Sequence, residues 1–378
     1  MKKIITSCII ALSCLFSAAY AFSWNGVFDN NTKTYTSNFK NYSLSQSNDV
    51  YLSLNVPFSK NCYMMTEGLF KYDLTLSSGG AVFTPIVDLD LLKFSNSYAV
   101  ENGTLSYSIG RFNFNESSGT YFTQCSDGAY ITYDSLKIKY GLYVGYTGLL
   151  NSLNVGMEEE NPNAKNTKFY NLCVGYIPIS ADFFYKTLFD TNRIGLQMSY
   201  FYNTQKDDSN GMSDKFYGTL SLGGTISTIG TYDFKGTFES VGFKTVSIDS
   251  KLDLSFYIGK IGVAGGGIEY ISGKLSDSFV PFTSITARSV TNGSVKSGIF
   301  PKLNCAIIYN NMYATFTEKL VLAIPEKQMS FRGFDTTINF VCNIFSDLQV
   351  GCDITAYIDI IEASSSNYTA ALKASLSF

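Results

Sequence analysis

The sequence contains no histidine, and this absence excludes more chemistry than any other single feature of the chain. Without an imidazole, a serine or cysteine nucleophile cannot be activated by the usual histidine base, so hydrolases that depend on that base are excluded. The commonest metal-binding side chain is also missing. We therefore expect no enzyme: the sequence predicts no catalytic residue, no metal site and no cofactor.

Charged residues are also scarce, at 16 % of the chain, whereas globular proteins usually have about a quarter. The formal net charge is −3, and no basic patch or run of aromatic and arginine residues suggests a nucleic-acid partner. Aromatic residues, by contrast, reach 15 %. A polar but weakly charged composition suits a protein with one surface in lipid and another in water.

The N-terminal 21 residues have the features of a signal peptide. Lys2 and Lys3 form a basic start, Ile4–Phe16 form an apolar segment, and Ala19–Ala21 has the small-x-small pattern that signal peptidase cleaves. We predict cleavage before Phe22, export through the general secretory pathway, and a single domain over residues 22–378. An uncleaved anchor and a lipid attached to Cys14 are the alternatives. The short apolar segment argues against the anchor, and the position of the preceding leucine argues against the lipid.

The cysteines do not form a recognisable framework. The chain has eight, two of which lie in the leader. The remaining six show neither a C-x-x-C motif nor a zinc-ligand spacing. We interpret them as small apolar residues of the protein wall, although an even number in an exported protein would permit disulfides.

Beyond the leader, no apolar run approaches the ~18 residues of a membrane-spanning helix. The recurring pattern has a period of two, in stretches of roughly ten residues. In Asp347–Ile360, seven consecutive positions of one parity are apolar, and the other parity carries three carboxylates. Similar alternation marks 136–146, 194–202, 252–258, 335–344 and Tyr368–Phe378.

We predict an all-β fold, a transmembrane antiparallel up-and-down β-barrel of about sixteen strands, between roughly 14 and 18, which would leave an aqueous lumen. A soluble antiparallel sandwich also alternates, but its strands are usually about five or six residues long. Phe22–Asp49 is predicted as one leading strand with a flexible entry, whereas 182–190 and 276–290 give weak patterns.

Connections of two kinds separate the stretches. Ser77–Gly80, Asn310–Asn311 and Phe345–Asp347 suit tight periplasmic turns. Asn151–Asn166 and Thr204–Lys215 are longer and polar, and we expect them to be solvated extracellular loops.

Several charged residues fall on the polar parity of these stretches. Opposed charges on a barrel wall could orient solutes and bias ion selection, or they could be ordinary hydrated residues, and the sequence does not decide between the two. The candidate pore-lining residues are Lys137, Lys139, Arg193, Lys251, Asp253, Asp353 and Asp359.

Two segments resemble known outer-membrane barrels. The ending, with Tyr368, Leu372, Leu376 and Phe378 on one parity, resembles the signal that the barrel-assembly machinery recognises. Ser108–Phe112, Ser117–Gly119, Cys125–Gly128 and Tyr146–Leu150 together resemble a stretch of porin-like barrels of spirochaetes. The resemblance implies a porin-like surface protein and supplies no catalytic residues.

The first functional hypothesis is an outer-membrane porin that lets small hydrophilic solutes or ions diffuse passively. The alternative is a surface antigen or adhesin whose barrel displays loops without forming an open channel. Both predict outer-membrane lipid and the barrel-assembly machinery as partners. The sequence leaves open the solute, the loop that would narrow the lumen, and whether three barrels associate as a homotrimer.

Overall fold

The computed structural model describes residues 22–37, 39–157, 170–189, 191–205, 213–273, 276, 278–286, 295–324 and 328–378. The predicted signal peptide, residues 1–21, lies outside these ranges, as do the charged residues 158–160. No helix within the described ranges is long and apolar enough to cross a membrane.

The described residues form 18 β-strands and one short 3-10 helix, η1 (Ala363–Ser365). The strands are β1 (Ser23–Ser37), β2 (Asn41–Ser59), β3 (Cys62–Ser77), β4 (Gly80–Val100), β5 (Gly103–Asn115), β6 (Thr123–Ser135), β7 (Ile138–Tyr146), β8 (Tyr176–Leu188), β9 (Asn192–Asn203), β10 (Lys215–Ile226), β11 (Gly230–Val241), β12 (Thr245–Ile258), β13 (Gly262–Ile271), β14 (Gly298–Tyr309), β15 (Met312–Ala323), β16 (Ser330–Asn343), β17 (Leu348–Asp359) and β18 (Asn367–Ser377).

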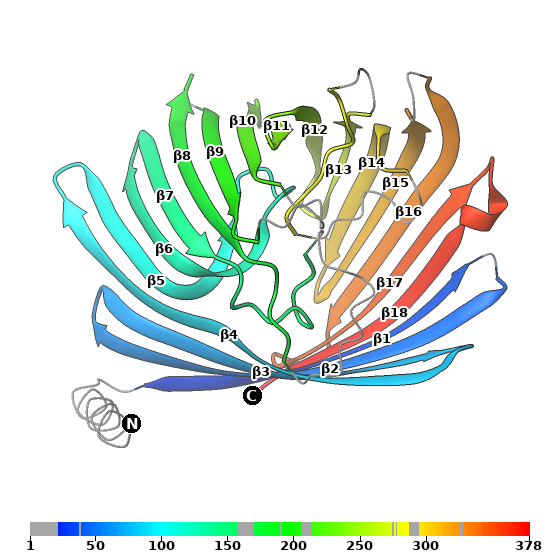
Figure 1. Cartoon of the computed structure of the whole chain (residues 1–378), viewed down its shortest axis with the longest axis horizontal. Coiled ribbons are helices and arrows are strands. Elements are labelled where there is room, and N and C mark those ends of the chain that lie inside the picture. Colours follow the sequence, from blue (N-terminus) through cyan, green and yellow to red (C-terminus); the bar gives the residue numbers. More distant parts are fainter. Residues whose placement is uncertain are drawn as a thin grey trace.

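Each strand pairs antiparallel with its neighbours in sequence, and β1 pairs with β18. The sheet is therefore a closed barrel, which Figure 1 shows as a ring of strands around the connections. This confirms the predicted fold class. The count of 18 is at the upper end of the predicted range and exceeds the central value of sixteen.

The two faces of the wall differ as the alternation predicts. Large apolar side chains on alternate positions are exposed on the outside, for example Leu303 at 68 % and Leu372 at 64 %. The intervening positions carry the charged residues, which face inward. An apolar exterior and a polar interior are what a barrel in lipid requires.

The two rims of the barrel are also different. Connections from an even to an odd strand, such as Asn310–Asn311 between β14 and β15, are short turns, and Phe345–Asp347 lies at this rim. The start of β1 and the end of β18 lie at the same rim, since Val27 pairs with Ser377. The turn within Ser77–Gly80 joins β3 to β4 and therefore lies at the opposite rim. The three turns therefore cannot all be periplasmic, contrary to the prediction, because turn chemistry specifies tightness but not the rim.

The segment predicted as one leading strand with a flexible entry is in fact β1 and much of β2. Both are long, and they pair from Ser23↔Asn55 to Ser37↔Asn41. Asn, Ser and Thr occupy both faces here, so the sequence lacks the contrast between apolar and polar positions that reveals a strand.

Candidate functional site

The described parts of three connections at the long-loop rim fold into the barrel, which the sequence could not predict. They join β5 to β6, β7 to β8 and β13 to β14, and Figure 1 shows the first two within the ring. Their described residues form an apolar core against the inner faces of the wall strands. This core contains Phe112, Phe114, Tyr121, Phe122, Tyr143, Leu150, Met157, Cys173, Tyr176, Phe201, Tyr217 and Ile285.

Aromatic stacking defines how the β5–β6 connection lies on the wall. The rings of Tyr121 and Tyr217 are parallel, with centroids 4.1 Å apart, and those of Phe114 and Tyr143 are 3.9 Å apart. The Tyr121 hydroxyl is also 2.8 Å from the Ser199 hydroxyl of β9. Because Tyr121 comes from the connection and the others from the wall, the connection is packed as a protein core and does not hang freely in the lumen.

A buried glutamate organises the tip of the same connection. Glu116 accepts hydrogen bonds from the backbone N–H groups of Ser118 at 2.6 Å and Tyr121 at 3.0 Å, and from the Ser118 hydroxyl. Burial raises the pKa of Glu116, and these hydrogen bonds oppose the rise. The neighbouring backbone N–H of Ser117 donates to Gln197 Oε1 at 2.6 Å, which fixes the tip to β9.

A second buried glutamate holds the β13–β14 connection. Glu239 of β11 is fully buried and accepts a hydrogen bond from the backbone N–H of Thr283 at 2.8 Å. The backbone N–H of Ile285 donates to the Tyr121 carbonyl at 2.8 Å, so this connection meets the β5–β6 connection inside the barrel. The two inward connections therefore support each other.

The β5–β6 hairpin leaves the wall at a row of glycines. Gly110 pairs with Gly128, and Gly128 pairs with Gly145 of β7. Gly110 has φ +116°, and a Cβ there would lie 2.0 Å from the Leu92 carbonyl oxygen. Only glycine fits such a position without strain. The pairing of β4 with β5 ends one residue later, at Leu92↔Arg111.

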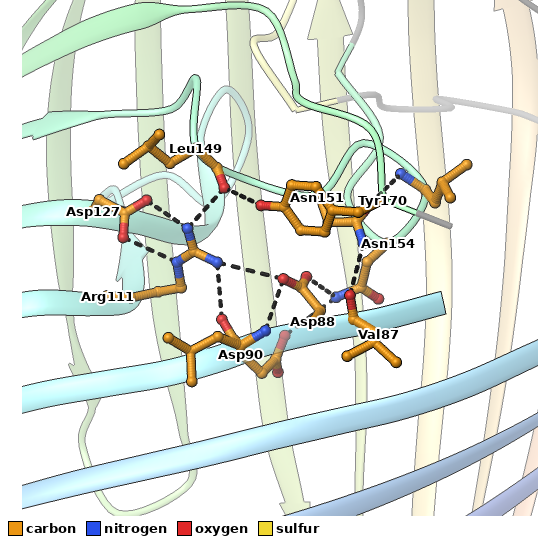
Figure 2. A network of polar contacts seen from close by, with 11 residues as sticks. Val87, Asp88, Asp90, Arg111, Asp127, Leu149, Asn151, Asn154 and Tyr170 are labelled. Carbon is orange, nitrogen blue, oxygen red and sulfur yellow. Dashed lines mark hydrogen bonds and ion pairs between the residues drawn. The ribbon is translucent and has the colours of Figure 1, made fainter. Parts of the chain in front are cut away.

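Arg111 bridges the gap that opens where β5 separates from β4 (Figure 2). Its guanidinium donates to both carboxylate oxygens of Asp127, at 3.0 and 2.7 Å, and to Asp88 at 3.4 Å. It also donates to the carbonyls of Leu89 and Leu149, at 2.9 and 2.8 Å. All five N–H groups have acceptors, as a buried guanidinium requires.

The edge of β4 that β5 leaves unpaired is capped by side chains of the β7–β8 connection. Asn151 donates to the Val87 carbonyl at 3.0 Å. Two residues further along β4, the Leu89 carbonyl accepts from Arg111. Asn154 donates to Asp88 at 2.9 Å and to Asp90 at 3.2 Å, which Figure 2 shows beside Arg111. An unpaired strand edge exposes backbone groups that need partners. Asn151 and Arg111 supply them for the carbonyls of Val87 and Leu89, and Asn154 holds the neighbouring carboxylates.

This placement corrects one prediction. Asn151–Asn166 was expected to be a solvated extracellular loop. Its described part, Asn151–Met157, is packed inside the barrel, with Asn151 fully buried. Two of its polar residues, Asn151 and Asn154, bond to β4 instead of facing solvent.

Three of the predicted pore-lining residues come from the β6–β9 wall. Lys137 is exposed in the turn before β7, at the short-turn rim. Lys139 lies on the inner face, with its ammonium 5.8 Å from the Phe184 ring centroid. Arg193 lies on the inner face of β9, largely exposed, and its guanidinium is 3.3 Å from Asp233.

The other four come from β12 and β17. Lys251 and Asp253 are 3.7 Å apart on the inner face of β12, and Asp253 is also 2.6 Å from Lys302. Asp353 forms an ion pair with Lys373 of β18. Asp359 lies at the long-loop end of β17, where its buried carboxylate is 2.6 Å from Arg332 and caps the connection to β18. The structure thus distributes the seven residues around the wall and does not gather them into one cluster.

The residues of the predicted assembly signal share the outer face of β18. Leu372, Leu376 and Phe378 are exposed, and Tyr368 stacks on Phe39 with centroids 4.4 Å apart. Phe378 closes the seam, because its N–H and carbonyl pair with Gly26 at 2.9 and 2.8 Å.

Sequence reasoning did not select the residues that position the inward connections. The main ones are Asp88, Arg111, Glu116, Asp127 and Asn151. Arg111 and Asp127 do occur in two of the four stretches that carried the porin resemblance, Ser108–Phe112 and Cys125–Gly128. A further signal was present in Tyr121–Phe122, where large aromatic residues occupy a connection between strands.

No protein-family model matches the chain, and no curated protein matches it. Solved structures do resemble it. OccK3 (OpdO) of Pseudomonas aeruginosa superposes with a TM-score of 0.64 at 10 % identity, covering 96 % of this chain and 97 % of that one. OccK5 (OpdH) of the same species gives 0.63 at 10 % identity, covering 94 % and 98 %. OccAB4 of Acinetobacter baumannii gives 0.62 at 8 % identity, covering 95 % and 98 %. At such identities the likeness shows the fold, and it does not confirm the spirochaetal part of the resemblance.

Proposed function

We propose that this protein is an outer-membrane channel through which small hydrophilic solutes or ions diffuse passively. The observation that carries the proposal is the closed ring of 18 strands with an apolar exterior and a charged interior. Barrels of 16–18 strands are too wide to be filled by their own wall side chains and leave an aqueous passage. The inward connections would narrow that passage from one side.

The wall charges support weak selectivity. Arg193, Lys251, Asp253 and Asp353 each lie next to an opposite charge on the inner face. Cations and anions would therefore both meet partners along the wall. We propose these four residues as pore-lining. Lys139 stays a candidate, whereas the burial of Asp359 and the rim position of Lys137 favour them less.

The likeness to the Occ and Opd structures shows the same barrel fold, and we propose the outer membrane as the location because the exterior of this barrel is apolar. We propose outer-membrane lipid and the barrel-assembly machinery as partners, with Tyr368, Leu372, Leu376 and Phe378 as the assembly signal. We propose that the protein is not an enzyme. A homotrimer stays a prediction.

The test is to refold residues 22–378 into detergent and record single-channel currents in a planar bilayer. Stepwise conductance that scales with salt would support the channel. The reversal potential in a salt gradient should shift toward anions in Asp353→Lys and toward cations in Lys251→Glu, since each changes the wall charge by two. A barrel that migrates as folded in unheated gels but passes no current would overturn the proposal and favour surface display.

A further inference from the structure

A hollow in the inner wall lies where the barrel closes, between β17, β18, β1 and β2. Its volume is about 400 Å³. The register places Asp29 opposite both Ser375 and Asp49, and Asn31 opposite Lys373. Small residues make room for it, because Gly351 and Ser375 occupy inward positions between longer side chains. We call this feature the seam hollow; its polar lining is Asp29, Asn31, Asp49, Gln349, Lys373 and Ser375.

The seam hollow has more hydrogen-bond acceptors than the surrounding chain satisfies. Asp29 and Asp49 are directly opposed on one face, an arrangement that is unfavourable for two like charges. Within the described residues, the Asp29 carboxylate forms no ion pair or hydrogen bond. Asp49 accepts a hydrogen bond from the Ser47 hydroxyl at 2.8 Å. Its nearest cation, Lys71, is 4.0 Å away and lies nearer to Asp73, at 3.8 Å.

A separate observation points the same way. The side-chain oxygen of Asn31 is buried and has no hydrogen-bond partner. A buried acceptor without a donor is costly and calls for an explanation, such as a ligand that donates to it. The one ammonium in the lining, Lys373, already forms an ion pair with Asp353. The hollow therefore has room for a further donor beside Asp29 and Asn31, and no described residue of the wall fills that position.

A primary ammonium group fits this lining better than a metal ion does. It carries three donors on a single positive charge, which matches two carboxylates and one amide oxygen. A calcium ion needs six to eight oxygen ligands, and no group of acidic, cysteine or histidine residues in the described part of the chain could hold a metal. The side chain of Val341 lines the hollow as well and would contact the methylene groups of an organic amine.

We propose that the seam hollow binds small hydrophilic solutes that carry a primary ammonium group. The proposal deepens the channel function, on which it rests for the entry of such solutes from the lumen. It predicts that amines are held on the β1–β2 side of the wall, away from the inward connections.

Binding is tested by titration calorimetry of residues 22–378 in detergent, with propane-1,3-diamine as the probe. We expect saturable binding that Asp29→Asn weakens by about tenfold or more, since a hydrogen bond to a charged group is lost. Asp134→Asn is the matched control, because that carboxylate lies on β6 and pairs with Lys186. Its affinity for the diamine should equal that of the native chain. Propane-1,3-diol, which has the same carbon chain without charge, should not bind.

Equal diamine affinity in Asp29→Asn and in the native chain would overturn the proposal. So would equal binding of the diol, or calcium chloride that binds with the same dependence on Asp29. Asp49→Asn provides the same comparison if Asp29→Asn does not reach the folded gel mobility. Currents in the bilayer without diamine binding would refute this site and leave the channel standing. Diamine binding that depends on Asp29 in a barrel that passes no current would support this site and refute the channel.

Discussion

Replacing Arg111 with methionine should release the β5–β6 hairpin from the wall without unfolding the barrel. Methionine keeps much of the length of the side chain and none of its five donors. The change leaves the Asp127 carboxylate, Asp88 and the carbonyls of Leu89 and Leu149 without the guanidinium that they share. Removing one partner of a buried ion pair typically costs about 3–5 kcal/mol. The ladders of the 18 strands are not altered.

The effect should therefore be local. A cost of about 3 kcal/mol corresponds to an opening equilibrium of the hairpin that is about 100-fold larger. Hydrogen exchange should show this as faster exchange of the β5–β6 amides beyond Gly110. If the hairpin narrows the passage, the single-channel conductance and its noise should both rise. The folded mobility in unheated gels should stay as in the native chain.

Arg193→Met is the matched control for the exchange measurement. It removes the same group from an ion pair in which the Arg193 side chain is 66 % exposed, and exposed pairs contribute only about 0–1 kcal/mol. Exchange of the β5–β6 amides should be unchanged in this variant. The reasoning would be refuted if Arg111→Met left both exchange and conductance at their native values.

Three further changes test the same architecture. Gly110→Ala should prevent the hairpin from turning inward, because φ is +116° and the new Cβ would overlap the Leu92 carbonyl; a native circular dichroism spectrum with native conductance would contradict this. Since burial raises the pKa of Glu116, its contribution to stability is complete below the ordinary value of 4.5 and is lost as the pH rises through the raised pKa. Conductance noise should therefore increase with pH over that window in the native chain and stay flat in Glu116→Gln. Gly26→Val should destabilise the folded barrel by about 1–3 kcal/mol and so lower the folded fraction on gels, because its side chain would meet the Phe378 ring; Phe378→Ala should partly restore that fraction.

The sequence predicts the fold well where the two faces of a strand differ in polarity. Ile354 and Ile358 are exposed on the outer face of β17, whereas Asp353 on the other parity faces inward. The prediction weakens where polarity does not alternate. Consecutive aromatic residues, Phe183–Tyr185, obscured the period in β8, and the amide- and hydroxyl-rich β1 and β2 were counted as one strand.

The inward connections could not be predicted in the same way. Whether Asn151 faces solvent or a strand edge depends on where β5 leaves β4, and that break joins residues far apart in sequence. The segment 276–290 gave no strand pattern because its described residues do not form a long strand; they contribute Ile285 to the core and Thr283 to the contact with Glu239. Composition registers such residues as polar or apolar but gives no information on their partners.

The separation of β5 from β4 explains why several unrelated residue types are needed together at one place. A closed barrel has no free strand edge, but a hairpin that turns inward creates one on β4. Gly110 allows the turn. Arg111 and Asn151 donate hydrogen bonds to the β4 carbonyls of Leu89 and Val87, respectively. Pro85 of β4 lacks the backbone N–H with which a further strand could pair. The same Arg111 ties the hairpin to Asp127 and to the β7–β8 connection. One set of contacts thus holds the hairpin inside the barrel and gives the edge of β4 its partners, so a variant that releases the hairpin should also expose that edge.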